Sequence, residues 1–111
     1  MILVSALYPN EAGSRFDADY YRDVHTPFAR NLLGPLGLTG LRSTTGIASV
    51  DGGPPPFWAI SELTFATRAD FDAALNRCGE ELFADIRNYT DVAPVLQVSS
   101  LDCDTIPSTG A

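Results

Sequence analysis

The pattern of apolar and polar residues along the chain predicts four β-strands. The strands cover residues 2–8, 38–49, 57–65 and 92–101. Pro9 ends the first apolar run, and Gly40 and Gly46 indicate that the second strand is twisted or bulged and lies at a sheet edge. The third strand is the clearest, because its residues alternate between two faces over its whole length. Pro94, near the start of the last strand, suits an edge position, since proline cannot donate to a central ladder.

Two further segments repeat apolar residues at helical spacing, which predicts two helices. Asp17 is the expected N-cap of the first helix, and Phe16 and Tyr21 are placed to pack together as a hydrophobic staple. Pro27 removes a backbone donor inside this helix. We therefore expect the first helix to kink or to split in two.

The second predicted helix begins at Thr67, which forms a capping-box pattern with Asp70, and Gly79 marks a point where this helix could be interrupted. The order of elements is strand, helix, strand, strand, helix, strand, which is the βαββαβ pattern of an α+β ferredoxin-like domain. Right-handed crossovers place both helices on one face of a four-stranded antiparallel sheet, with the first and third strands in the middle. Residues 1–101 form this single domain, and residues 102–111 form a loose C-terminal tail.

Apolar residues occupy both faces of the predicted sheet. In the third strand Phe57 and Phe65 point to one face, and Trp58 and Ile60 point to the other. Helices cover only one face, and a bare second face would expose a contiguous apolar patch, which monomers usually avoid. We therefore expect a two-fold homodimer in which a second copy covers the helix-free face.

Composition and charge narrow the classes of function. The 111 residues are 45% hydrophobic, which is enough for one packed core. A net charge of -7, with seven Arg and no Lys, offers no basic stripe and argues against nucleic acid and membrane surfaces as partners. The apolar start lacks a basic leader and is too short to span a membrane, so we expect a cytoplasmic protein. Cys78 and Cys103 lack CxxC spacing, and we interpret them as reduced thiols.

Three stretches of the chain resemble the EthD family, which is named for its association with ethyl tert-butyl ether degradation. They read RFDADYYRDVHTPFA, PPPFWAISELTFATRADFDAAL and ADIRNYTDVAPVLQVS. The resemblance implies a dimeric α+β barrel. It also implies kinship with small cofactor-free enzymes, including polyketide cyclases, decarboxylases and dehydratases, and with proteins of unestablished activity.

His25 is the only histidine and the leading candidate for moving a proton, because the pKa of histidine lies near neutral pH. Tyr21 lies four residues earlier, so both side chains share one helix face and could meet one bound ligand. Alternatively, His25 is a capping or surface residue beside Pro27, with its ring satisfied by a backbone carbonyl. The resemblance to the EthD family favours a catalytic role for His25 and Tyr21.

Further residues are candidates for substrate binding: Phe28, Trp58, Glu62, Tyr89 and Asp91. Glu62 could act as an acid or base if it is buried, but it could instead be exposed or form an ion pair near the dimer seam. Trp58 and Phe28 could line a pocket or simply pack. Tyr89 and Asp91 could reach the mouth of a cavity, or they could be ordinary turn residues.

One His, two distant Cys and no carboxylates paired at ligand spacing predict no metal site, and the absence of nucleotide-binding glycine patterns predicts no cofactor. The leading hypothesis is a cofactor-independent enzyme of the cyclase, decarboxylase or dehydratase type. It would act on a small apolar carbonyl or aromatic compound by proton transfer through His25, with Tyr21 or Tyr89 orienting the substrate. The alternative is a non-catalytic accessory protein that binds a hydrophobic compound for an oxygenase or degradation pathway. Haem binding through a histidine, as in other dimeric α+β barrels, is a third hypothesis, and the absence of His from the second helix argues against it.

Overall fold

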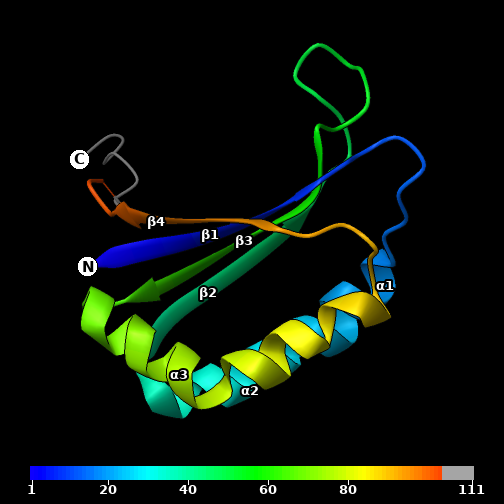
Figure 1. Cartoon of the computed structure of the whole chain (residues 1–111). Coiled ribbons are helices and arrows are strands. Elements are labelled where there is room, and N and C mark those ends of the chain that lie inside the picture. The colour runs from blue at the N-terminus through cyan, green and yellow to red at the C-terminus, as the bar shows by residue number, and fades with distance from the viewer. Residues whose placement is uncertain (104–111) are drawn as a thin grey trace.

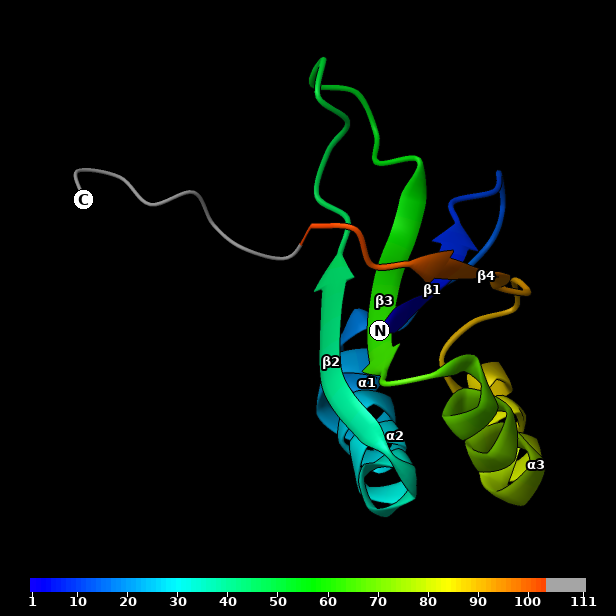
Figure 2. The same cartoon turned by 90° about the vertical axis from the view of Figure 1, so that its left-hand side faces the viewer.

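The computed structural model describes residues 1–103, which form one antiparallel sheet with helices on one face (Figure 1). The strands are β1 (Ile2–Pro9), β2 (Leu38–Thr45), β3 (Phe57–Phe65) and β4 (Val95–Ser100). Their order in the sheet is β2-β3-β1-β4, so the first and third strands lie in the middle. Figure 2 shows both main helices on the same side of the sheet. The predicted α+β ferredoxin-like topology is therefore confirmed.

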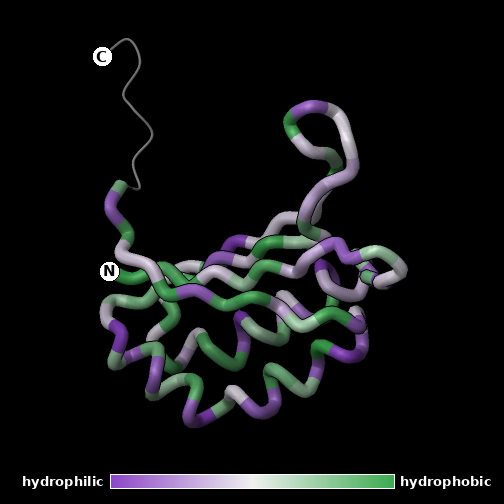
Figure 3. Tube along the Cα trace, turned by 45° about the horizontal axis from the view of Figure 1, so that its top comes forward, coloured by the Kyte–Doolittle hydropathy of each residue, from purple (hydrophilic) through white to green (hydrophobic). Residues whose placement is uncertain are grey.

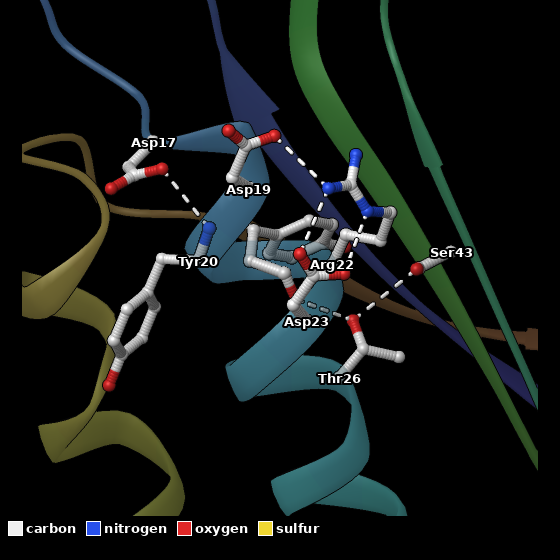
Figure 4. A network of polar contacts seen from close by, with 8 residues as sticks. Asp17, Asp19, Tyr20, Arg22, Asp23, Thr26 and Ser43 are labelled. Carbon is white, nitrogen blue, oxygen red and sulfur yellow. Dashed lines mark hydrogen bonds and ion pairs between the residues drawn. The ribbon is translucent and has the colours of Figure 1, made fainter.

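The first helical segment begins where the capping pattern predicts. It consists of α1 (Ala18–Tyr20), a π-helical turn (Tyr21–His25), α2 (Thr26–Leu33) and a 3-10 turn (Gly34–Leu36). The Asp17 carboxylate accepts a hydrogen bond from the Tyr20 amide at 3.0 Å (Figure 4). The ring centroids of Phe16 and Tyr21 lie 5.2 Å apart, which confirms the predicted staple. Together these contacts fix where the chain enters the helix.

The π-helical turn lies immediately before Pro27. In a regular α-helix Pro27 would lack a donor and would clash with the carbonyl four residues earlier. The turn is instead one residue wider, and both the amide and the hydroxyl of Thr26 donate to the carbonyl of Tyr21, the hydroxyl at 2.9 Å. The predicted split of the helix therefore takes the form of a π turn, and this turn contains His25.

The second main helix, α3 (Arg68–Ala84), is capped by Thr67, whose hydroxyl accepts a hydrogen bond from the Asp70 amide at 3.1 Å, as predicted. The expected interruption at Gly79 is wrong, because α3 continues through this residue. Gly79 is buried beside Leu75 and Phe83 of the same helix, and a single glycine costs a helix of this length only about 1 kcal/mol. A 3-10 turn (Ile86–Asn88) follows α3.

The strand register places alternate residues toward the helices. Val4 on β1 pairs with Leu63 on β3 and with Val98 on β4, and all three side chains belong to the same apolar cluster. The buried members of this cluster are Val4, Leu33, Phe65, Phe71, Ala74 and Cys78. A second cluster gathers nearer the end of β1, and its buried members are Ala6, Tyr8, Tyr21, Ala59, Tyr89 and Val92. The core thus combines aliphatic side chains with phenylalanine at one end of the domain and is rich in tyrosine at the other.

The second strand is shorter than its pattern predicts. β2 ends at Thr45, and residues 46–56 form a loop that projects beyond the sheet (Figure 1). Ile47 and Val50 in this loop are fully exposed. The predicted irregularity is confirmed by a register shift between Leu38 and Gly40, and β2 is an edge strand as expected.

The last strand is also shorter, since β4 starts at Val95 rather than at residue 92 and ends at Ser100. Pro94 directly precedes it, at the place where a missing backbone donor costs no ladder bond. Within the predicted tail, Asp102 and Cys103 have no regular secondary structure, and residues 104–111 lie outside the described residues.

The helix-free face of the sheet carries both apolar and polar residues. Leu3, Leu7 and Ile60 are half-buried on this face and alternate with Ser5 and Glu62 in the paired strands. Figure 3 shows the change from apolar to polar residues along the strands. In the part of the chain that the structure describes, no helix has the length and apolar character needed to cross a bilayer.

Candidate active site

A cavity of about 70 Å³ lies between the sheet and the helices. One water molecule needs about 10–15 Å³ by the same measure, so the cavity has room for more than one water molecule. Most of its wall is apolar, and the side chains include Leu41, Leu63, Leu75, Phe83 and Leu96. The polar side chains that reach it are Tyr8, His25, Thr26 and Ser61, and the residues lining it include no Arg, Asp or Glu. Such a wall suits a neutral, largely apolar molecule with a hydrogen-bonding group.

His25 forms a buried pair with Asp85. The Nδ1 atom of His25 lies 2.8 Å from Oδ2 of Asp85, which stands where α3 ends and the following 3-10 turn begins. A carboxylate at Nδ1 holds the proton on that nitrogen and leaves Nε2 as the acceptor. Among residues 1–103 no group hydrogen-bonds to Nε2, and no fully buried side-chain nitrogen or oxygen lacks a partner. Nε2 therefore faces open space, and His25 lines the cavity.

Two further donors hold the Asp85 carboxylate in place. The Tyr20 hydroxyl donates to Oδ1 at 2.7 Å, and the Asn88 amide donates to the same oxygen at 2.9 Å. Burial alone would raise the pKa of Asp85, but the hydrogen bonds from Asn88, Tyr20 and His25 outweigh it and lower this pKa. The carboxylate is therefore ionised at neutral pH and has a fixed orientation toward the imidazole.

Burial also controls the protonation of His25. It lowers the pKa of the imidazole, and the hydrogen bond and negative charge of Asp85 offset only part of this effect. At neutral pH His25 is accordingly an uncharged imidazole with a free Nε2 atom. A ring in this state can accept a proton, and the carboxylate behind it stabilises the imidazolium that forms.

Three tyrosines surround the His25 ring and the adjoining wall. The ring centroids of Tyr89 and Tyr21 lie 4.6 Å and 6.0 Å from that of His25. The Tyr8 and Tyr89 hydroxyls form a hydrogen bond of 2.6 Å, and the Tyr21 hydroxyl bonds to Ser61. Tyr8 and Ser61 line the cavity, whereas Tyr21 and Tyr89 contact them but do not line it.

A model of the EthD domain matches residues 14–93 of this chain. The chain belongs to the EthD family. The EthD match contains His25, Asp85 and Tyr89, whereas Tyr8 precedes it. A search of curated proteins found no match.

Solved structures agree with the EthD assignment and with the fold. An EthD-like protein from Ralstonia eutropha JMP134 is 38% identical, with a TM-score of 0.85 and 94% of each chain covered. An EthD family protein from Bacillus halodurans C-125 is 17% identical, with a TM-score of 0.64, 90% of this chain and 97% of that chain covered. A dimeric ferredoxin-like protein from an uncultured marine organism is 10% identical, with a TM-score of 0.61, 96% of this chain and all of the other covered. The last two likenesses show the shared fold alone.

In this EthD protein the structure brings together His25, Tyr21 and Tyr89, three of the residues that the sequence singled out. Sequence reasoning missed Asp85 and Tyr8. Asp85 lies inside the stretch ADIRNY, which resembles the family, and this was the one signal that could have pointed to it. Tyr8 ends an apolar strand and carries no sequence signal beyond packing.

The two aromatic candidates from the sequence lie away from the cavity wall. Trp58 donates its indole N–H to the hydroxyl of Ser14 at 2.8 Å and stacks on Phe16, with ring centroids 6.1 Å apart. Phe28 is half-buried on α2 and does not line the cavity. Both residues therefore fit the alternative that they simply pack.

The two acidic candidates have other partners. Glu62 lies on the helix-free face and accepts hydrogen bonds from Arg42 at 2.7 and 2.9 Å, which is the ion pair that the sequence allowed as an alternative. Asp91 accepts a hydrogen bond from the backbone amide of Arg15 at 2.9 Å and so ties the turn before β4 to the segment before α1. Among residues 1–103 no group of three or more His, Cys, Asp or Glu side chains is placed to hold a metal ion.

Proposed function

We propose that this EthD protein is a cofactor-independent enzyme that binds a small, largely apolar carbonyl or aromatic compound in the cavity and transfers a proton through His25. The observation that carries the proposal is the 2.8 Å hydrogen bond from His25 Nδ1 to Asp85, which leaves Nε2 free on a mainly apolar wall. General bases in proteins work best when they are uncharged near neutral pH and are oriented by a second group. His25 meets both conditions.

The proposed chemical step is the removal of a proton from the carbon next to a carbonyl group. Nε2 of His25 accepts this proton, the electrons of the broken C–H bond form an enolate, and the Asp85 carboxylate stabilises the imidazolium. Return of the proton to another atom of the same molecule restores the neutral imidazole. Reactions of the cyclase, decarboxylase and dehydratase types all include proton transfers of this kind.

A second candidate function is a non-catalytic accessory role, in which the protein binds a hydrophobic compound for an oxygenase or degradation pathway. The mainly aliphatic wall of the cavity favours this alternative, because its side chains offer contact area rather than reactive groups. The two functions differ in their outcome: a bound compound is converted in the first and is released unchanged in the second.

The proposal includes a homodimer in which the helix-free faces of two sheets pack together. Leu3, Leu7 and Ile60 supply apolar contact area on this face, and Arg42 with Glu62 supplies an ion pair among them. Burial of such a face against a second copy removes apolar surface from water. The dimer would not cover the cavity wall formed by the helices, which lie on the other side of the sheet.

Deuterium exchange tests the enzymatic proposal. Neutral aromatic and alicyclic ketones are incubated in D₂O, and NMR follows the loss of the proton next to the carbonyl. The wild type should accelerate this exchange for at least one ketone, and His25→Ala should lose about 10²–10⁴-fold of the acceleration. Val24→Ala, which changes an exposed neighbour in the same turn, is the matched control. Equal rates for the wild type and His25→Ala would exclude His25, and binding without any exchange would favour the accessory role.

A further inference from the structure

Two buried hydroxyl groups form a pair beside the cavity. Tyr8 comes from β1 and Tyr89 from the turn after α3, and their oxygens are 2.6 Å apart. The exposed fraction is 3% for Tyr8 and 0% for Tyr89. Only Tyr8 lines the cavity. The pair therefore joins the Tyr8 hydroxyl at the cavity wall to the Tyr89 hydroxyl inside the core.

The hydrogen atoms of this pair can be counted. Two hydroxyls carry two hydrogens, and one of them lies between the oxygens. If Tyr8 donated it, the hydrogen of Tyr89 would be left without an acceptor inside the core, since among the described residues its hydroxyl bonds only to Tyr8. A buried donor without a partner is costly and rare. The economical arrangement is that Tyr89 donates to Tyr8, so that the hydrogen of Tyr8 is free to point into the cavity.

The surrounding rings keep this donor in place. Phe16, Tyr21 and Tyr89 each contact the ring of Tyr8, with centroids 5.6, 5.7 and 5.7 Å away. A hydroxyl that already accepts a hydrogen bond is also a stronger donor, because bonds in a chain polarise one another. Burial raises the pKa of Tyr8 to about 12, so the hydroxyl keeps its hydrogen over the whole working range of pH.

The donor and the imidazole share one site. His25 and Tyr8 both line the cavity, and both rings contact the ring of Tyr89, at 4.6 and 5.7 Å. A ligand that fills the cavity can therefore meet both polar groups. The cavity wall carries no Arg to neutralise an anionic ligand.

We propose that the Tyr8 hydroxyl binds the oxygen of a neutral ketone or phenol in the cavity, and that Tyr89 is the positioning residue that directs the Tyr8 hydrogen toward this oxygen. The inference rests on the proposed function in one respect: during enolate formation the negative charge develops on the oxygen that Tyr8 holds. A donor placed at this oxygen stabilises the charge as it forms. The substrate class is then a neutral oxygen compound rather than a carboxylate.

The test compares acetophenone with α-methylstyrene, which has the same shape but carries CH₂ in place of the carbonyl oxygen. Calorimetry or ligand-observed NMR gives both dissociation constants. The wild type should prefer acetophenone by about tenfold, the value expected for one good hydrogen bond in an apolar site. Tyr8→Phe should abolish this preference and leave the affinity for α-methylstyrene within about twofold. Benzoate should bind at least about tenfold more weakly than acetophenone, because its charge would lose hydration without a counter-charge.

The carbonyl stretch of ¹³C-labelled acetophenone reports on the hydrogen bond directly. Its frequency should be lowered in the wild type, less lowered in Tyr89→Phe and unshifted in Tyr8→Phe. A purely structural role of Tyr89 would leave this frequency unchanged in Tyr89→Phe. Affinity for α-methylstyrene serves as the folding control in each variant.

Several results would overturn the inference. They are an unchanged preference in Tyr8→Phe, a preference abolished by Tyr21→Phe instead, and no acetophenone binding to the wild type at millimolar concentrations. Its failure can be separated from that of the proposed function. A preference that depends on Tyr8 without any deuterium exchange would support the inference and refute catalysis, whereas exchange that depends on His25 but not on Tyr8 would do the reverse.

Discussion

Asp85 and His25 meet across two helical segments, with 2.8 Å between Oδ2 and Nδ1, although 60 positions separate them in the chain. Their hydrogen bond joins the end of α3 to the π turn before α2. Tyr20 and Asn88 bind the other oxygen of the carboxylate, so both oxygens are occupied and the carboxylate cannot rotate without losing bonds. The orientation of the imidazole is thus set by a residue that does not itself line the cavity.

Replacement of Asp85 by Asn should change both the titration and the activity of His25. The carboxylate raises the pKa of His25 against the effect of burial, so Asp85→Asn should lower this pKa further. The amide can also impose the wrong tautomer, and exchange activity should fall by about 10²–10⁴-fold. Because His25 is the only histidine, a single imidazole resonance in an NMR titration reports the pKa. Asp72→Asn, which removes an exposed carboxylate on α3, should change neither quantity.

The stability of the domain should depend on pH through His25. Its pKa is lowered in the folded state, so the unfolded chain binds the proton first as the pH falls. The free energy of unfolding should therefore decrease as the pH drops through about 6.5, the ordinary value, and should level off below the folded pKa. Urea denaturation of the wild type and of His25→Gln between pH 8 and pH 5 measures this. A variant that loses stability as steeply as the wild type would show that another group is responsible.

The two halves of the tyrosine pair should differ in their effect on stability. Tyr8→Phe leaves the hydroxyl of Tyr89 buried without a partner, which costs about 1–3 kcal/mol in addition to the lost bond. Tyr89→Phe leaves the hydroxyl of Tyr8 at the cavity wall, and only the bond itself is lost, about 0.5–1.5 kcal/mol. Urea denaturation of both variants gives the order. Greater destabilisation by Tyr89→Phe would contradict the placement of the Tyr8 hydroxyl at the cavity wall.

The helix-free face should hold two copies together. The wild type should have twice the chain mass of 11.9 kDa by light scattering, and Ile60→Glu should shift it to the single-chain mass. The carboxylate introduced at position 60 would lie beside Leu7, and in the dimer it would be desolvated and unpaired. Val24→Glu puts the same charge on an exposed apolar residue of the π turn and should keep the mass of the wild type. A wild type that is monomeric at micromolar concentration would contradict the homodimer.

Local rules predicted much of the fold. Asp17 and Thr67 start their helices because each offers a side-chain acceptor to an otherwise unpaired amide, a property that can be read from the residue and its neighbours. The third strand has the predicted bounds because alternation continues along its whole length. Pro94 marks the start of β4 for an equally local reason.

The site depends on contacts that no local pattern contains. The pairing of His25 with Asp85 requires knowledge of how α3 ends relative to the π turn, and the pairing of Tyr8 with Tyr89 joins residues 81 positions apart. The interruption expected at Gly79 was wrong for a different reason: α3 continues through this glycine beside Leu75 and Phe83 of the same helix, and one glycine costs a helix only about 1 kcal/mol. Sequence spacing placed Tyr21 beside His25 correctly, but it could not tell that its hydroxyl turns to Ser61.

Because the π turn holds one residue more than an α-helical turn, the position of His25 depends on the number of residues between Asp17 and Pro27. A deletion of one residue here would restore a regular α-helix, in which each residue turns by about 100° relative to the last. Either the Asp17 cap would then be rotated by that angle from its present position, or His25 would be rotated away from Asp85. Any chimaera that exchanges this segment with a relative must therefore keep its residue count, even where the residues themselves can change.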